Sequence, residues 1–161
     1  MAEPVICAVA RTPVGKFRGG LRSHSATQLG AVAVMELLQR AGIEPGSDTV
    51  EELIFGQVLQ AGSGQAPARQ VAIFAGLPYS TPCLTINKVC GSSLKAVMIA
   101  ATSIRAGEYE VVVAGGMESM SNAPHFAKKT GRNEYGEMVS IMVQDGLWDA
   151  YNDVHMGTVP E

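Results

Sequence analysis

Charged side chains are scarce in this sequence of 161 residues, and they form no basic cluster. Only 17% of the residues are charged, and 15 acidic against 12 basic residues give a formal net charge of −3. Proteins that bind nucleic acid concentrate Lys and Arg against the phosphates, so nucleic acid is not an expected partner. Apolar residues make up 47% of the chain, which excludes intrinsic disorder and is enough for a buried core of single-domain size.

We also expect no disulfide framework, leader or membrane segment in this sequence. Its three cysteines are an odd number without metal-ligand spacing, which indicates a reduced intracellular protein. No basic region precedes the first apolar run, and no apolar run is long enough to span a bilayer. We therefore predict a cytoplasmic protein without a membrane partner. The spacing of His24, His125 and His155 matches no zinc pattern, so no metal site is expected.

Short β-branched runs alternate with helical patterns along the first part of the chain. Strands are predicted over residues 4–10, 53–58, 83–87 and 111–114, and helices over residues 26–41, 67–75 and 92–106. This alternation predicts an α/β fold with a mostly parallel sheet. The helix over 92–106 is apolar nearly all round, which indicates a helix buried between two layers.

Local signals support the first helix and mark a change of character late in the chain. Ser25 and Gln28 have capping-box spacing, Gly42 supplies a stop, and Glu36 and Arg40 can pair across one turn. From residue 125 onward, clustered charges surround an amphipathic stretch, and we interpret this part as a loop-like excursion outside the sheet. The predicted division is therefore 1–124 and 125–161.

The candidate nucleophile is Cys90, which lies between a predicted strand and a predicted helix in Asn87-Lys-Val-Cys-Gly-Ser-Ser93. A helix N-terminus presents unpaired N–H groups and a positive dipole end, and both favour a thiolate. Gly91 would let a reacting carbonyl approach, and the Cys90 N–H is a candidate oxyanion donor, as in a nucleophile elbow. The alternative is a small cysteine that merely packs. For Cys7 and Cys83, inside apolar strands, packing is the prediction.

Other motif-like segments have structural interpretations when taken by themselves. Residues 62–67 follow a strand and open a helix, but Pro67 stands where a dinucleotide fingerprint needs a small residue. Residues 115–120, Gly-Gly-Met-Glu-Ser-Met, follow the last strand, where parallel sheets place functional residues, although a turn of small residues explains them equally. His155, in His-Met-Gly157, is the histidine best placed to line a pocket.

Four segments together resemble the N-terminal part of the thiolases. They are Ala10-Arg-Thr-Pro-Val-Gly-Lys-Phe17, Gly56-Gln-Val-Leu-Gln-Ala-Gly-Ser-Gly-Gln-Ala-Pro-Ala-Arg-Gln70, Asn87-Lys-Val-Cys-Gly-Ser-Ser-Leu-Lys-Ala96 and Gly115-Gly-Met-Glu-Ser-Met-Ser-Asn-Ala-Pro124. The third is shared more loosely with ketoacyl synthases, whereas the second and fourth favour thiolase. The resemblance implies a layered α/β/α/β/α fold, of which this chain would carry the first half, with residues 125–161 beginning the CoA-binding loop region.

The resemblance also implies a function. Cys90 would accept an acyl group as a thioester in a ping-pong transfer between CoA thioesters, by thiolysis of a 3-ketoacyl-CoA or condensation of two acetyl-CoA, as in fatty acid metabolism. Coenzyme A would be a substrate, and no cofactor is expected. His155 and Met156 would line the pantetheine tunnel, with Met156 limiting the acyl chain. The strand at Thr85–Ile86 would pair with its own copy in a homo-oligomer, a dimer or tetramer, with Gln65 supporting the partner's site.

Members of this family are more than twice as long. Three of their functional residues lie in the other half: the histidine of a Gly-His-Pro segment, the asparagine of an Asn-Glu-Ala-Phe segment and a second cysteine in a Cys-x-Gly-Gly segment. None of these three segments occurs in the 161 residues. We therefore expect little or no turnover from this chain alone, and an apolar patch where the helix over 92–106 would meet a second sheet. Two alternatives are a non-catalytic acyl-CoA-binding or dimerisation remnant of the fold and a ketoacyl-synthase-like condensing protein.

Overall fold

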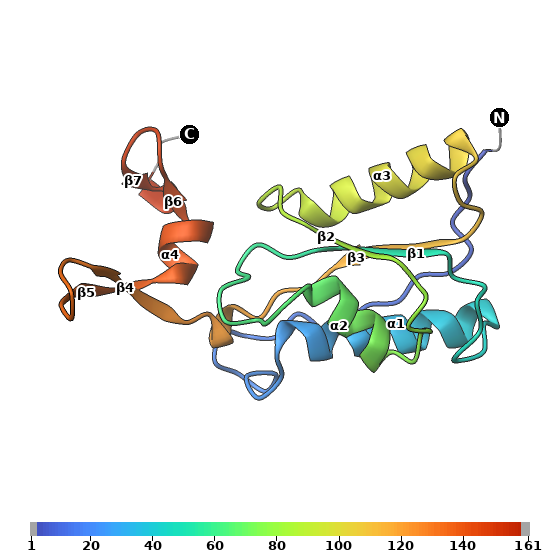
Figure 1. The fold of residues 1–161 in the computed structure, drawn as a ribbon, viewed down its shortest axis with the longest axis horizontal. Helices are drawn as coiled ribbons and strands as arrows, with labels where there is room; N and C mark the ends of the chain where they lie inside the picture. The colour runs from blue at the N-terminus through green and yellow to red at the C-terminus, as the bar shows by residue number, and fades with distance from the viewer. Residues whose placement is uncertain (1–2, 159–161) are drawn as a thin grey trace.

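A three-stranded parallel sheet covered by helices forms the main body of the computed structural model, which describes residues 3–158 (Figure 1). The elements are, in chain order, α1 (Ala26–Ala41), β1 (Glu52–Gly56), α2 (Pro67–Phe74), β2 (Cys83–Ile86), α3 (Ser92–Ala106), β3 (Val112–Gly116), the 3-10 turn η1 (Met120–Asn122), β4 (His125–Lys129), β5 (Tyr135–Ser140), α4 (Ile141–Gly146), β6 (Trp148–Asp149), β7 (Val154–His155) and the 3-10 turn η2 (Met156–Thr158).

The strand order is β2-β1-β3, and both pairs are parallel. Helix α2 connects β1 to β2, and α3 connects β2 to β3. Helices α1 and α2 cover one face of the sheet, and α3 covers the other (Figure 1). The predicted α/β fold with a parallel sheet is therefore confirmed. The pairing register aligns Gly56 with Ile86 and with Gly116, so the three strands end at one edge.

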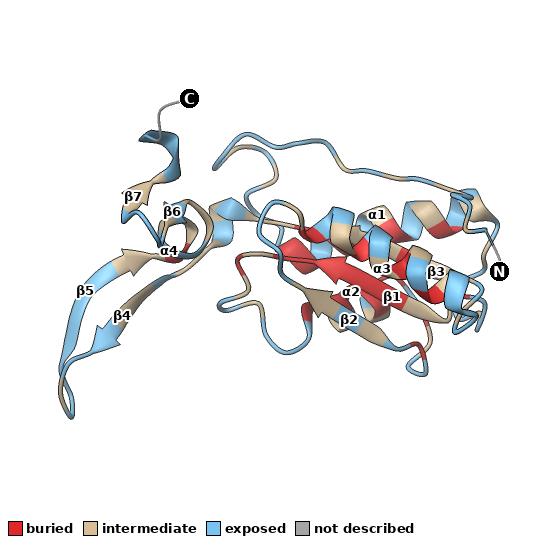
Figure 2. Ribbon diagram, turned by 90° about the horizontal axis from the view of Figure 1, so that it is seen from above, coloured by how far each residue is buried: buried red, intermediate tan, exposed pale blue. Residues whose placement is uncertain are grey.

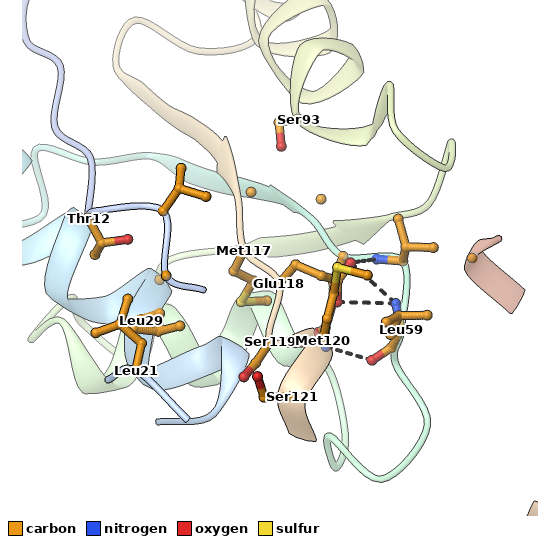
Figure 3. A pocket seen from close by; sticks show the side chains of 18 of the residues that line it. Thr12, Leu21, Leu29, Leu59, Ser93, Met117, Glu118, Ser119, Met120 and Ser121 are labelled. Carbon is orange, nitrogen blue, oxygen red and sulfur yellow. Dashed lines mark hydrogen bonds between the residues drawn. The ribbon is translucent and has the colours of Figure 1, made fainter. Parts of the chain in front are cut away.

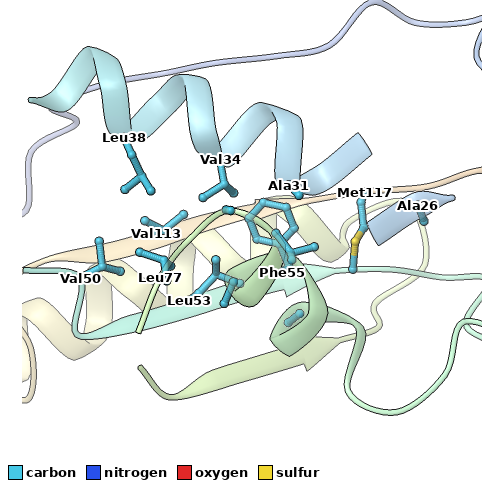
Figure 4. Close-up of a cluster of buried hydrophobic side chains, with 14 residues drawn as sticks. Ala26, Ala31, Val34, Leu38, Val50, Leu53, Phe55, Leu77, Val113 and Met117 are labelled. Carbon is cyan, nitrogen blue, oxygen red and sulfur yellow. The ribbon is translucent and has the colours of Figure 1, made fainter. Parts of the chain in front are cut away.

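The core is divided between the two faces of β1 because side chains alternate along a strand. Leu53 and Phe55 join a large cluster under α1 and α2, where Val34 and Leu38 of α1 pack onto them (Figure 4). Ile54 points the other way and packs with small residues of α3. The central strand is therefore buried on both faces, as its continuous apolar sequence predicts.

Helix α1 has the ends that its sequence predicts. The Ser25 hydroxyl accepts from the Gln28 N–H at 3.2 Å, and the Gln28 side chain accepts from the Ser25 N–H at 2.9 Å. The helix stops at Gly42, whose φ of 68° lies in the left-handed region that glycine tolerates. Glu36 and Arg40 form the expected ion pair at 2.7 Å on its exposed side.

The prediction of a buried strand over residues 4–10 is wrong. Val5 and Ile6 are 76% and 78% exposed, Cys7 is also exposed, and none of residues 4–10 belongs to a strand. A β-branched sequence supplies the propensity for a strand but not the pairing, and the segment pairs with neither edge strand of the sheet, β2 or β3. The segment is tied to α1 instead through Arg40, which donates to the Val9 carbonyl at 2.8 Å. The prediction that Cys7 packs is wrong for the same reason.

The prediction that α3 is buried on all sides also fails within the described residues. A stripe of small residues faces the sheet: Ser92, Ala96, Ala100 and Ser103. The opposite face is apolar and open, with Leu94 67% exposed and Met98 51% exposed (Figure 2). The composition correctly indicates a helix without a polar face, but residues 3–158 provide only one of the two layers.

Residues 125–158 lie to one side of the sheet and add no strand to it (Figure 1). They are more regular than the predicted loop, since β4 and β5 form an antiparallel hairpin, and β6 and β7, which follow α4, form a second antiparallel pair. Residues 159–161 of the predicted unit 125–161, and residues 1–2 of the unit 1–124, fall outside the described residues. No helix within residues 3–158 is long and apolar enough to cross a bilayer.

The two-sided burial of β1 gives a stability test. Leu53→Ala is expected to lower the free energy of unfolding by about 2–5 kcal/mol, because Leu53 is fully buried and its removal leaves a cavity. Leu94→Ala, the same change on the open face of α3, should alter it by less than about 0.5 kcal/mol. Urea unfolding followed by circular dichroism measures both, and equal losses at the two positions would contradict this packing.

Candidate active site

Cys90 lies in the short turn between the end of β2 and the start of α3. Gly91 is the N-cap residue of α3, so Cys90 directly precedes the helix, and its side chain is exposed. The structure thus places the sulfur at a helix start and open to solvent, as the sequence predicts for a nucleophile. The packing alternative for Cys90 finds no support in this position.

The turn that carries Cys90 contains a strained residue. Val89 has a φ of 47°, a left-handed conformation that β-branched residues rarely adopt and that costs about 1–3 kcal/mol. The Asn87 side chain accepts from the Val89 N–H at 2.9 Å, and the Gly91 N–H donates to the Lys88 carbonyl at 3.0 Å. This sharp strand-to-helix turn is similar to a nucleophile elbow, but the strained residue is Val89 and not Cys90 itself.

Cys90 lines a cavity of about 880 Å³ at the carboxyl edge of the sheet. The cavity wall is built from all four segments that carry the thiolase resemblance, through residues 11–17, 56–59, 89–93 and 116–121. Three of them converge because β1, β2 and β3 end in register, so the segments that follow these strands emerge at one edge, while residues 11–17 reach the same edge without following a strand. Figure 3 shows Met117, Glu118 and Ser119 on one side of this cavity and Thr12 on another. The segment 115–120 is therefore more than a turn, since most of it faces the cavity.

Two glycines on neighbouring strands allow the first turn of α3 to pack directly against the strand ends. Gly56 and Gly116 are register partners on β1 and β3. A Cβ on Gly56 would lie 2.6 Å from the Ser92 Cβ, and a Cβ on Gly116 would overlap the Ser93 hydroxyl. A side chain at Gly56 would meet the backbone of Ser92 and Ser93, so none fits there without moving the helix, whereas a side chain at Gly116 would have to displace the Ser93 hydroxyl. These close approaches fix the first turn of α3, and with it Cys90, against the sheet.

Glu118 joins the loops that follow β1 and β3. Its carboxylate accepts from the Val58 N–H at 2.8 Å and from the Leu59 N–H at 3.3 Å (Figure 3). Burial raises the pKa of Glu118 above its ordinary value, and the two backbone hydrogen bonds offset only part of that rise. The sequence analysis did not single out Glu118, and only its place directly after a strand end could have indicated it.

Gln57 is a second functional candidate that the sequence analysis missed. It is 2% exposed, and its amide donates to the Leu59 carbonyl at 3.0 Å and to the Ser63 hydroxyl at 2.8 Å. Its Oε1 has no hydrogen-bond partner among residues 3–158. Gln57 therefore holds the loop after β1 in one conformation beside the cavity.

The other predicted site residues lie apart from Cys90. His155 is half-buried in β7, and Met156 begins η2 and is 48% exposed, and neither lines the Cys90 cavity. His24 and His125 do not line it either. Within residues 3–158, no group of three or more His, Cys, Asp or Glu side chains is arranged to hold a metal ion. Cys83 packs against the core as predicted, and burial raises the pKa of its thiol.

Two carboxyls should shape the pH dependence of stability in opposite directions. Folding raises the pKa of Glu118. Its contribution to the free energy of unfolding therefore falls as pH rises from about 4.5 toward the pKa of Glu118 in the folded protein. Backbone hydrogen bonds from Glu110 and Val111 lower the pKa of Glu51. Its contribution to the free energy of unfolding is therefore lost as pH falls below about 4.5.

We expect Glu118→Gln to make the free energy of unfolding less dependent on pH above pH 4.5, and Glu51→Gln to make it less dependent on pH below that value. Urea midpoints measured from pH 3 to 7 test both changes. Identical curves for the two variants would contradict the burial of Glu118.

Known proteins resemble this chain along its whole length. The family model "Thiolase, N-terminal domain" matches residues 4–161. Acetyl-CoA acetyltransferase of Cupriavidus necator is 54% identical over 164 residues, which cover 100% of this chain and 41% of the relative. Acetyl-CoA acetyltransferase 2 of Arabidopsis thaliana is 54% identical over 159 residues, covering 97% and 39%, respectively. The mitochondrial acetyl-CoA acetyltransferase of Xenopus tropicalis is 52% identical over 161 residues, covering 99% and 38%.

A solved structure extends the likeness to the fold. The crystal structure of Acat5 thiolase from Ascaris suum in complex with coenzyme A matches with a TM-score of 0.85 and 40% identity, over 94% of this chain and 39% of that one. The chain thus spans about two fifths of the length of the relatives it matches. The predicted thiolase-like α/β fold is confirmed, and by sequence and by structure the chain belongs to the thiolase family.

Proposed function

We propose that Cys90 accepts an acyl group from a CoA thioester and passes it to a second substrate. One observation carries the proposal: the exposed Cys90 stands before α3, on the wall of the cavity where the four family segments meet. The names of the relatives, acetyl-CoA acetyltransferases, support acyl transfer as the reaction class. Bound coenzyme A in the Ascaris suum thiolase supports CoA thioesters as the substrates.

The proposed chemistry has two half-reactions. The Cys90 thiolate attacks the thioester carbonyl, the Cys90 N–H donates to the oxyanion, and the CoA thiolate leaves. The acyl group then sits on sulfur as a thioester of similar energy. This first half-reaction belongs to condensation, which the enolate of a second acetyl-CoA completes by attacking the acetyl carbonyl and releasing the Cys90 thiolate. Thiolysis runs the same path in reverse: the thiolate attacks the 3-keto carbonyl of the 3-ketoacyl-CoA, the C2–C3 bond breaks, the acetyl-CoA enolate leaves and takes up a proton, and CoA then removes the acyl group from Cys90. Coenzyme A is a substrate of thiolysis and a product of condensation, and the scheme needs no resident cofactor.

The base that restores the thiolate is outside the cavity described above. None of the three histidines lines it, and the resemblance assigns this role to a Gly-His-Pro segment that the 161 residues do not contain. A nucleophile without its base keeps only part of its rate advantage. We therefore expect this chain alone to take up an acyl group slowly and to show little steady-state turnover.

Other expectations from the resemblance are also proposals. The tunnel roles of His155 and Met156 stay predictions for the whole protein, as do the cytoplasmic location and the role in fatty acid metabolism; one relative is mitochondrial. For self-association we propose β2, because it forms an edge of the three-stranded sheet and Leu84 on it is exposed. A partner copy paired there would lie next to Gln65, which is exposed in the loop before α2.

Acylation of this chain by acetyl-CoA tests the proposal. We expect up to one acetyl group per chain, located on the Cys90 peptide by mass spectrometry and released by hydroxylamine, as a thioester is. Cys90→Ser should abolish it. Cys7→Ser should not change it, because Cys7 is also exposed but does not line the cavity.

Three outcomes would contradict the proposal or favour an alternative. Equal labelling of Cys7 and Cys90 would mean nonspecific thiol chemistry. Binding of acetyl-CoA without labelling would favour the non-catalytic remnant. Faster acylation from acyl carrier protein than from acyl-CoA would favour the ketoacyl-synthase-like alternative.

A further inference from the structure

The conformation of Val89 requires a compensating interaction. A valine with a φ of 47° is strained, and the turn that contains it is exposed at residues 87–90. In an open turn, solvent offers the backbone other conformations, and any relaxation at Val89 would move the adjacent Cys90. Something in the surrounding structure must therefore hold the strained form.

The Ser92 side chain makes the contacts that can do this. Its hydroxyl accepts from the Lys88 N–H at 2.8 Å and donates to the Val89 carbonyl at 2.6 Å. The hydroxyl is donor and acceptor at once, and it holds the peptide group before Lys88 and the peptide group after Val89. The φ and ψ rotations of Val89 lie between these two held groups. The Ser92 N–H also donates to the Val89 carbonyl at 3.1 Å.

Burial makes these bonds more effective. Ser92 is 4% exposed, so water competes poorly for its hydroxyl. Its backbone is fixed by the close approach to Gly56, which leaves no space for a Cβ. The N-cap residue Gly91 has no side chain to cap α3, so Ser92, inside the first turn, is the hydroxyl that reaches back to the loop.

We propose that Ser92 is the positioning residue of the nucleophile: its buried hydroxyl holds Val89 in the left-handed conformation that keeps Cys90 at the start of α3. The inference rests on the proposed function for its biological meaning, since it assumes that Cys90 is the acyl acceptor. The geometry itself concerns only the reactivity of Cys90, which is measurable without any CoA substrate.

The test is alkylation of the parent chain and of Ser92→Ala by iodoacetamide at neutral pH, resolved by peptide mass spectrometry. Cys7, exposed in the N-terminal segment, serves as the internal reference thiol in the same molecule. Removing both hydrogen bonds of the Ser92 hydroxyl should lower the ratio of the Cys90 alkylation rate to the Cys7 alkylation rate by roughly tenfold. Ser103→Ala, the same change at another buried position of α3, should leave the ratio unchanged.

A second variant separates positioning from general destabilisation. Glycine adopts positive φ without strain, so Val89→Gly in the Ser92→Ala background should restore the ratio to within about threefold of the parent. If Ser92→Ala alone does not fold, the double variant is expected to fold and to show that restored ratio. An unchanged ratio in Ser92→Ala, or a loss that Val89→Gly does not restore, would overturn the inference. Acetyl-CoA labelling that fails while the ratio behaves as expected would instead count against the proposed function alone.

Discussion

The structure depends on the close approach between the first turn of α3 and the ends of two parallel strands. Gly56 and Gly116 stand side by side at the carboxyl edge of the sheet, where the backbone of Ser92 and Ser93 occupies the space that a side chain on Gly56 would fill and the Ser93 hydroxyl occupies that above Gly116. The contact is steric, and it determines where the helix begins. Because β2 leads into that helix through a short turn, the same contact forces the turn to be sharp and places Cys90 at its outer side.

The site follows from this constraint together with the register of the sheet. Parallel strands that end in register send their following loops to one edge, where the loops after β1 and β3 enclose the space next to Cys90. Glu118 joins these two loops at the cost of burying a carboxyl group, as its raised pKa indicates. The strained residue Val89 lies in the short connection between β2 and this helix, where the Ser92 hydroxyl bonds to the residues on either side of the strain.

The sequence predicted what local patterns determine. The ends of α1 and the alternation of strands and helices came from capping, glycine stops and periodicity, and each of these acts over a few residues. The failures came from long-range partners. Residues 4–10 had strand propensity without a ladder partner, and α3 had the composition of an enclosed helix with only one layer beside it. Glu118 and Gln57 were missed because their contacts lie in loops whose meeting point depends on the register of the sheet.

The glycine contact fixes Cys90 at the start of α3, where we propose that it accepts an acyl group. The most direct measurement is the rate of Cys90 acetylation by acetyl-CoA in Gly56→Ala, compared with Gly20→Ala, where an added methyl group meets nothing within 4 Å. The account predicts that Gly56→Ala loses at least about tenfold in rate while its circular dichroism still shows the folded sheet and helices, and that Gly20→Ala labels like the parent. A folded Gly56→Ala chain that is acetylated at the parent rate would contradict it.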